Sequence, residues 1–273
     1  MSFKPLMLAA ALFALPIAVF AQGGGEAKDN TMAEIEKYRE MLAGDNPAEL
    51  YEAKGEEIWK RKAGPKDASL EKCDLGLGPG VVKGAYAQMP RHFADVNKVQ
   101  DLESRLVHCM VTLQGFKAED LTKEPFDTDD RKTDLNALVA YVVGASKGMT
   151  INPPLKHPQE KEMAELGKRI FFYRAGPYDF SCATCHAENG RRIRLQDLPN
   201  LTTHIGSQRA YGSWPAYRIS EGLFRSMQWR INDCFRQQRF PEPQFGSDTV
   251  TALLLFLASN AAGGKYDGPG FKR

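Results

Sequence analysis

The 273-residue sequence predicts a mostly α-helical protein that contains two tandem domains of the same design. In the second half, residues 157–176 place Met163, Leu166 and Ile170 at helical spacing, which predicts an amphipathic helix. Residues 247–259 form an apolar run that opens with a Ser-Asp capping signal, so a closing helix is expected there. A long irregular region separates these two helices.

The first half of the chain repeats this order. Residues 46–64 predict a leading helix, and residues 130–146 predict a closing one. Between them, a fixed offset of 125 positions aligns Ala85-Tyr86-x-x-Met89-Pro90 with Ala210-Tyr211-x-x-Trp214-Pro215. The same offset aligns Arg105 with Arg230, Leu106 with Ile231 and Cys109 with Cys234. Several matches in one register indicate a duplicated domain.

The expected domain boundaries follow from this repeat and from the start of the chain. Residues 46–150 and 159–273 are the two domains, and the Pro-rich residues 151–158 are a plausible linker. Residues 1–21 combine an early Lys4 with an apolar run of about fifteen residues, which is typical of a secretory signal peptide cleaved after Ala21. Residues 22–45 then form an N-terminal extension. We expect export to the periplasm, with no membrane span and no nucleic-acid partner.

The second domain contains a haem-attachment motif. Cys182-Ala183-Thr184-Cys185-His186 is a Cys-x-x-Cys-His sequence, in which two thiols can bind haem covalently while the imidazole binds its iron. A redox dithiol does not need His186. A zinc site needs a second pair of ligands at compatible spacing, and the sequence offers none. We therefore expect one covalently bound haem c and a cytochrome c-like fold in both domains.

The first domain lacks most of this motif, so it is expected to be degenerate and haem-less. At the corresponding place it keeps Cys73 but neither a second thiol nor a histidine. Because the exported protein meets an oxidising compartment, Cys73 and Cys109 are expected to form a disulfide. Two free thiols, or a pairing with Cys234, are the alternatives.

Cys234 is then left without a partner, in the region where small cytochromes c supply the second axial ligand. A thiolate ligand lowers the reduction potential of a haem and allows chemistry at the sulfur, whereas a methionine ligand favours electron transfer. The other candidate ligands are Met227, His204 and Met163. A small buried hydrophobic residue is the simplest alternative role for Cys234.

A helix is expected over residues 220–240, which would place Arg230 one turn before Cys234 on the same face. A guanidinium there favours the thiolate and can hold an oxyanion. Residues 191–240 contain nine arginines, no lysine and three acidic residues, which suits an anionic ligand or an acidic partner. A contact with a haem propionate or with solvent is the alternative for Arg230. Arg105 occupies the corresponding position in the haem-less domain, and a structural role for Arg230 is therefore a further alternative.

Taken together, these residues resemble SoxA, the c-type cytochrome subunit of bacterial thiosulfate-oxidising systems, in its single-haem form. The resemblance rests on Cys-Ala-Thr-Cys-His at 182–186, Arg-Ile-Asn-Asp-Cys at 230–234 and the Cys73/Cys109 pair. It implies an L-cysteine S-thiosulfotransferase that pairs with a small monohaem cytochrome, SoxX. That enzyme joins thiosulfate to a cysteine of the carrier protein SoxY and passes two electrons to cytochrome c.

The resemblance also implies roles for two residues of the second domain. Cys234 would be both a catalytic residue and the second axial ligand of the haem iron, opposite His186, and it is often found as a persulfide in the family. Arg230 would lie in the substrate channel as a catalytic and substrate-binding residue. Two other functions stay open: an electron-transfer cytochrome whose iron is bound by Met227 or His204, and a thiosulfate dehydrogenase that makes tetrathionate. The dehydrogenases usually carry two haem motifs, unlike this chain.

Overall fold

The computed structural model describes Lys37 and residues 46–126, 130–193 and 196–272. Residues 46–272 belong to one compact unit. The expected signal peptide, residues 1–21, lies outside the described residues, as does nearly all of the expected extension. Among the helices that the structure describes, none is long and apolar enough to cross a membrane.

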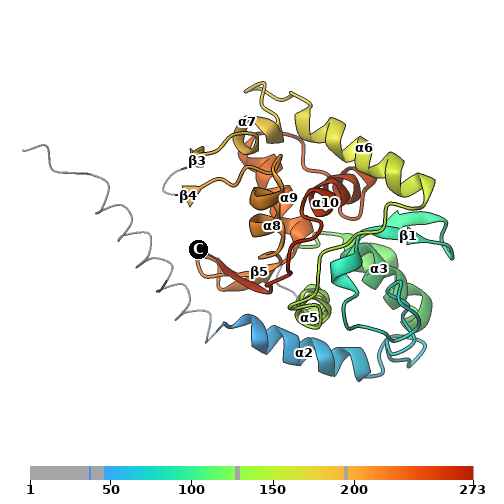
Figure 1. The fold of residues 1–273 in the computed structure, drawn as a ribbon. Helices are drawn as coiled ribbons and strands as arrows, with labels where there is room; N and C mark the ends of the chain where they lie inside the picture. Colours follow the sequence, from blue (N-terminus) through green and yellow to red (C-terminus); the bar gives the residue numbers. More distant parts are fainter. Residues whose placement is uncertain (1–36, 38–45, 127–129, 194–195, 273) are drawn as a thin grey trace, which may run out of the picture. The chain divides into compact units, whose positions relative to one another are not determined.

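The protein is mostly helical, as the sequence predicts (Figure 1). The α-helices are α2 (Ala48–Lys60), α3 (Leu102–Cys109), α4 (Ala118–Thr122), α5 (Asp130–Gly144), α6 (Pro158–Phe172), α7 (Cys182–His186), α8 (His204–Tyr211), α9 (Met227–Gln237) and α10 (Asp248–Asn260). A 3-10 turn, η1 (Tyr86–Gln88), precedes α3, and a π-helical turn, η2 (Met110–Gln114), continues it.

The strands are short and form three small sheets. Strands β1 (Arg91–Phe93) and β2 (Lys98–Gln100) pair antiparallel, as do β3 (Arg192–Ile193) and β4 (Gln196–Asp197). The third sheet has the order β6-β5-β7, formed by β6 (Leu223–Arg225), β5 (Ala216–Arg218) and β7 (Gly270–Lys272). Strand β5 is antiparallel to β6 and parallel to β7.

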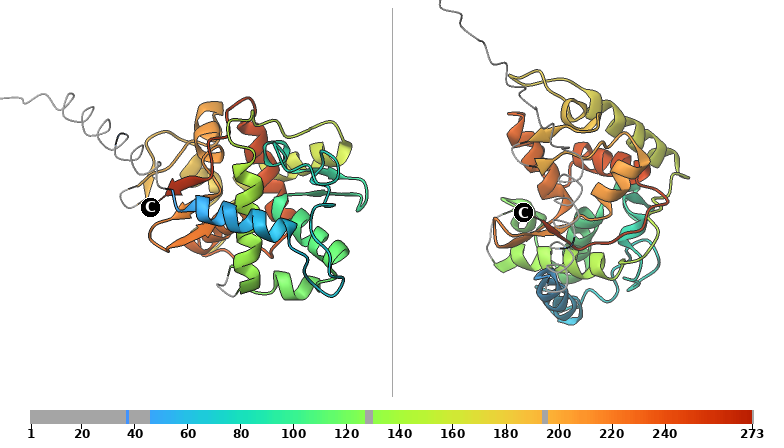
Figure 2. Two further views of the ribbon diagram at one scale, coloured as in Figure 1. Left: turned by 90° about the horizontal axis from the view of Figure 1, so that it is seen from below. Right: turned by 60° about the vertical axis from the view of Figure 1, so that its left-hand side comes forward.

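Each half of the chain contains one pair of crossed helices. Helix α2 packs on α5, and α6 packs on α10, as the ribbon views show (Figures 1 and 2). Both crossings have a glycine at the point of closest approach. A Cβ atom on Gly55 would collide with the carbonyl oxygen of Ala137, and a Cβ on Gly167 would collide with that of Ala252. Glycine at each crossing therefore lets the two backbones approach closely.

The Pro-rich segment expected to link two domains is packed against both halves. Ile151 is fully buried, and its backbone N–H donates to the carbonyl oxygen of Gly264 at 2.9 Å. The N–H of Gly263 donates back to Ile151 at 2.9 Å, and the N–H of Asn152 donates to Ala87 at 2.7 Å. The segment thus contributes to the contact between the halves.

The prediction of a helix over residues 220–240 is wrong for the first third of that range. Helix α9 begins only at Met227, because residues 223–225 pair with β5 as strand β6. Gly222 adopts φ +66°, a left-handed conformation that breaks a helix and turns the chain between β5 and β6. The hydroxyl of Ser226 then caps α9 by accepting the N–H of Trp229 at 3.3 Å.

Candidate functional site

The Cys-x-x-Cys-His motif forms the one-turn helix α7. Its start is fixed by a capping box, in which Ser181 Oγ accepts the N–H of Thr184 at 3.2 Å and Thr184 Oγ1 accepts the N–H of Ser181 at 3.0 Å. Residues three apart in a helix lie on one face, so Cys182 and Cys185 can reach the same ligand. Both cysteines are free.

The imidazole of His186 is held in the form that binds a metal. Its Nδ1 lies 2.9 Å from the carbonyl oxygen of Pro199. A carbonyl only accepts hydrogen bonds, so Nδ1 carries the proton and Nε2 keeps a free lone pair. Burial lowers the pKa of His186, and the positive charge of Arg230 lowers it further. The ring is therefore neutral at neutral pH, as a metal ligand must be.

The three free thiols of the protein lie close to one another. Burial raises the pKa of Cys182 to about 12, and the nearby thiols of Cys234 and Cys185 add to this effect. In the described part of the chain, no group of three or more His, Cys, Asp and Glu side chains could hold a bare metal ion. A haem iron needs only two protein ligands, because the porphyrin supplies the others. The donor set, two thiols and a neutral imidazole with a further thiol nearby, fits a covalent haem.

Arg230 and Cys234 lie one turn apart on α9, as predicted from their spacing. Burial raises the pKa of Cys234, whereas the guanidinium of Arg230 opposes this by favouring the thiolate. Arg230 Nη1 donates to Asp233 Oδ2 at 3.0 Å, and the same carboxylate accepts from Arg236 and Gln237. Sequence reasoning missed Asp233, although its place beside Cys234 in an arginine-rich segment was a signal.

The counterpart Arg105 is built into the structure in a different way. Its side chain is 5% exposed, and its Nη1 donates to both carboxylate oxygens of Asp95 at 3.0 and 2.8 Å. Its Nε donates to the carbonyl oxygen of Asp74 at 2.6 Å, and its guanidinium lies 4.0 Å from the ring centroid of Phe93. Arg230, at 24% exposure, keeps donors available for a ligand.

Two further arginines flank α9 on the β5–β6 hairpin. Arg225 is held by two hydrogen bonds, because its Nε donates to Glu221 at 2.7 Å and its Nη1 to the carbonyl oxygen of Phe126 at 3.0 Å. Arg218 Nε lies 3.5 Å from Glu221. Burial lowers the pKa of Arg218, and the positive charge of Arg230 lowers it further. Of the two, Arg218 is the one with capacity for an anion.

The other candidate ligands occupy different surroundings. Met227 is buried at the first turn of α9, and Met163 is partly exposed on α6. His204 is exposed at the start of α8, and its Nδ1 lies 2.9 Å from the carbonyl oxygen of Asn260. Among these candidates, Cys234 acts electrostatically on Cys182 and Cys185 of the haem motif, which indicates that its thiol lies near them.

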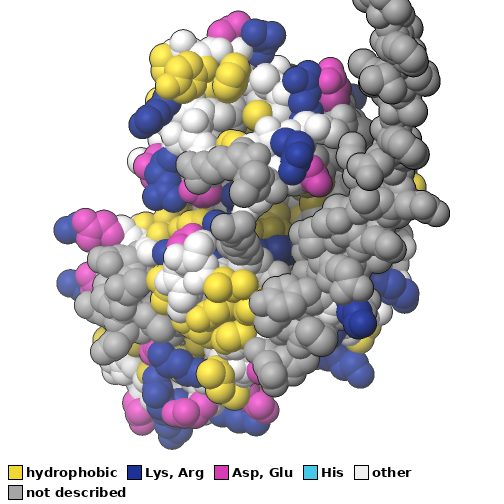
Figure 3. Space-filling view, turned by 90° about the vertical axis from the view of Figure 1, so that its left-hand side faces the viewer, with side chains coloured by type: hydrophobic (Ala, Val, Ile, Leu, Met, Phe, Trp, Pro, Cys, Tyr) yellow, Lys and Arg dark blue, Asp and Glu magenta, His cyan; other side chains and the backbone are white. Residues whose placement is uncertain are grey.

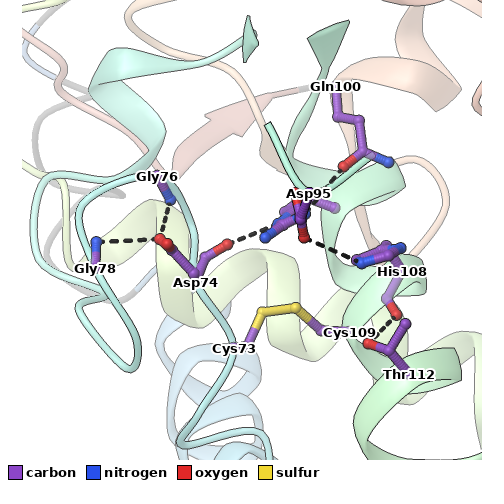
Figure 4. Close-up of polar contacts among 10 residues, drawn as sticks. Cys73, Asp74, Gly76, Gly78, Asp95, Gln100, His108, Cys109 and Thr112 are labelled. Atoms are coloured by element: carbon purple, nitrogen blue, oxygen red, sulfur yellow. Dashed lines mark hydrogen bonds and ion pairs between the residues drawn. A yellow bond between two sulfur atoms is a disulfide. The ribbon is translucent and has the colours of Figure 1, made fainter. Parts of the chain in front are cut away.

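The expected disulfide between Cys73 and Cys109 is present, with the two Cα atoms 5.6 Å apart. It excludes the alternative pairing with Cys234, whose thiol is free. Asp74, next to the disulfide, accepts the N–H groups of Gly76 and Gly78, so a hydrogen-bonded loop stands where the second half has its haem helix (Figure 4).

Crossed helix pairs and a one-turn helix formed by a Cys-x-x-Cys-His motif define this protein as a c-type cytochrome. A family model described as SoxA/TsdA, cytochrome c domain, matches residues 54–151, in the half without the haem motif. A SoxA subunit of L-cysteine S-thiosulfotransferase from Hydrogenophilus thermoluteolus is 54% identical over 88% of this chain and 87% of its own length. Another, from Hydrogenobacter thermophilus, is 34% identical over 96% of this chain and 99% of its own.

The chain belongs to the SoxA family of L-cysteine S-thiosulfotransferase subunits. A crystal structure of SoxXA from P. pantotrophus has the same fold, with a TM-score of 0.69 and 26% identity over 84% of this chain and 80% of that one. The family, the cytochrome c fold, the enzyme class and haem c as cofactor are thereby confirmed.

Proposed function

We propose that this chain binds one haem c through Cys182 and Cys185, with His186 and Cys234 as the axial ligands of the iron. It would do so as the larger subunit of a heterodimer with a SoxX-type cytochrome, exported to the periplasm after cleavage behind Ala21. The first domain, residues 46–150, would carry no haem. The proposal is supported by the proton on Nδ1 of His186 and by the closeness of three free thiols.

The site suits the joining of thiosulfate to a thiol. Arg230, with Arg218 nearby, would hold the sulfonate and so place the outer sulfur of thiosulfate against Cys234. Loss of two electrons joins these sulfurs, so that the Cys234 thiolate and thiosulfate become an adduct in which Sγ of Cys234 is bonded to the sulfane sulfur, Sγ–S–SO₃⁻. The bound haem supplies the route by which the electrons leave for cytochrome c. The thiolate of a SoxY-type carrier then attacks the adduct's sulfane sulfur and releases the Cys234 thiolate.

The observation that carries this proposal is the shared face of α9, on which Arg230 lies one turn from Cys234 beside the haem motif. The test is Cys234→Ala in the complex with its partner, assayed for transfer of thiosulfate to the carrier. We expect loss of transfer with retention of the covalent haem. The control is the double variant Cys73→Ala/Cys109→Ala, which removes two cysteines from the other half.

Two results would contradict the proposal. Full transfer activity in Cys234→Ala would remove the proposed role of the thiol. Production of tetrathionate from thiosulfate alone, without a carrier, would indicate a thiosulfate dehydrogenase. Intact-mass analysis with peptide mapping tests the single haem, the cleavage site and any extra sulfur on Cys234.

A further inference from the structure

Helix α9, which carries Arg230 and Cys234, begins at a buried polar network supplied largely by the other half of the chain. Asp101 and Glu103, at the start of α3, are 2% and 3% exposed. Gln228, the second residue of α9, is 1% exposed. Burial of polar groups is costly unless they are hydrogen-bonded, so these three side chains depend on one another.

The hydrogen bonds of this network converge on Gln228. Its backbone N–H donates to Glu103 Oε1 at 3.2 Å, and its side-chain Nε2 donates to the two carboxylate oxygens of Asp101 at 2.9 and 3.0 Å. Its Oε1 accepts the N–H of Gly246 at 2.8 Å. Asp101 also accepts the hydroxyl of Thr251 at 3.1 Å. The network therefore joins α3 to α9 and α10.

Glu103 accepts a hydrogen bond from the first turn of α9, where the backbone N–H groups need acceptors from outside the helix. The first N–H groups of a helix have no acceptor within it, and its positive end favours a carboxylate. In α9 the hydroxyl of Ser226 accepts the N–H of Trp229, and the carboxyl group of Glu103 accepts the N–H of Gln228. The first turn of α9 is thus held from outside the helix, by a residue on α3.

We propose that Asp101 and Glu103 are positioning residues for the transfer reaction, which through Gln228 hold α9 so that Arg230 and Cys234 face the haem motif. This inference rests on the proposed function, which gives Arg230 and Cys234 their roles. Neither carboxylate is required to touch thiosulfate or iron. The half without a haem motif acquires a role in catalysis, because it fixes the helix on which the reacting sulfur is placed.

The test is Glu103→Leu in the haem-loaded complex with its SoxX-type partner. Three quantities are measured: the ferric electron paramagnetic resonance signal, hydrogen–deuterium exchange of the α9 amides, and kcat and KM for thiosulfate. We expect an altered or split low-spin signal, faster exchange in α9 and a fall in kcat/KM of about 10- to 100-fold, because small misplacements at a reacting centre have large effects on rate. Glu103→Gln keeps an acceptor for the N–H of Gln228 and should stay close to wild type in these three quantities.

A matched control separates positioning from stability alone. Leu70 is fully buried in the same half, and its backbone bonds to Trp59 and Cys73 rather than to α9. Leu70→Ala should lower Tm without changing the resonance signal or the exchange of α9. If Glu103→Leu behaves in the same way as Leu70→Ala, the network is merely structural and the proposal is overturned.

Two further variants keep the result decisive. Should Glu103→Leu fail to fold, Gln228→Met removes the side-chain bonds to Asp101 and Gly246 while keeping the helix N–H, and the same readouts apply. Unchanged resonance and exchange in Gln228→Met would also overturn the proposal. Cys234→Ala, measured in parallel, tests the proposed iron ligand separately. An unchanged resonance signal in Cys234→Ala would contradict the ligand assignment. The exchange of the α9 amides in the Glu103 and Gln228 variants would still decide the positioning role.

Discussion

The rings of Tyr86 and Tyr211 are parallel, with an interplanar angle of 1° and centroids 6.0 Å apart. Tyr86 Oη donates to the carbonyl oxygen of Trp214, and Tyr211 Oη donates to that of Met89, both at 3.4 Å. Each tyrosine thus bonds to the residue that lies three positions after the other. Such a reciprocal exchange is characteristic of contacts about a two-fold axis, and it supports the duplication inferred from the sequence.

Tyr86→Phe and Tyr211→Phe should lower the free energy of unfolding by similar amounts, about 1 kcal/mol each, because each removes one hydrogen bond to a buried carbonyl. Urea unfolding of the two variants measures this. Since the rings contact each other, the double variant should deviate from the sum of the single ones. A large fall in the free energy of unfolding for one variant and none for the other would contradict the reciprocal arrangement.

Arg230→Met and Arg105→Met should separate function from structure. Removing Arg230 takes away the proposed sulfonate donor, so transfer activity should fall by about 100-fold while the fold is retained. Removing Arg105 leaves the carbonyl of Asp74 without its donor, so stability should fall by about 2 kcal/mol with little effect on transfer by the folded fraction. The measurements are kcat/KM for thiosulfate and urea unfolding of both variants.

The opposite pattern would be informative. If Arg105→Met lost activity at constant stability, or if Arg230→Met lowered the free energy of unfolding and left transfer by the folded fraction intact, the distinction drawn between the two arginines would be wrong. Arg192→Met is a suitable control, because Arg192 is 59% exposed and pairs with Asp197 on the β3–β4 hairpin.

Much of the candidate site could be predicted because its signals are local in sequence. The haem motif spans five residues, and Arg230 and Cys234 share one helical turn, so spacing alone relates them. Strand β6 was missed although its partner β5 is close in sequence, because no proline interrupts residues 220–240 and the left-handed turn at Gly222 was not recognised. The bond from Gln228 to Glu103 could not be predicted from spacing, because it joins residues far apart in sequence.

Loss of the Cys73–Cys109 disulfide should destabilise the first half without affecting haem attachment. A cross-link that closes a loop of this length stabilises a protein by about 4 kcal/mol on the chain-entropy model. Cys73→Ser/Cys109→Ser should therefore show a lower urea midpoint but an unchanged haem content by mass. A loss of haem in this variant would indicate that the first half is needed for attachment at α7.

Stability should depend on the protonation of Glu103. Burial, followed by the charge of Asp101, raises the pKa of Glu103 from 4.5 to about 7. A carboxyl with a raised pKa holds its proton in the folded state after the unfolded chain has released it, so the free energy of unfolding falls as pH rises between these values. Tyr86 and Tyr211 also face Glu103 but stay neutral there, because burial raises their pKa values above the usual range.

Glu103→Gln removes this titration. Compared with wild type, the variant should gain stability between pH 4.5 and about 7, by an amount on the order of a few kcal/mol, and the gain should level off above that range. Urea unfolding at intervals of pH measures the difference, and Glu71→Gln, at an exposed carboxyl of the same half, is the control. A difference between Glu103→Gln and wild type that does not change with pH would show that Glu103 titrates at its ordinary value, and burial would then be offset by its bonds to α9.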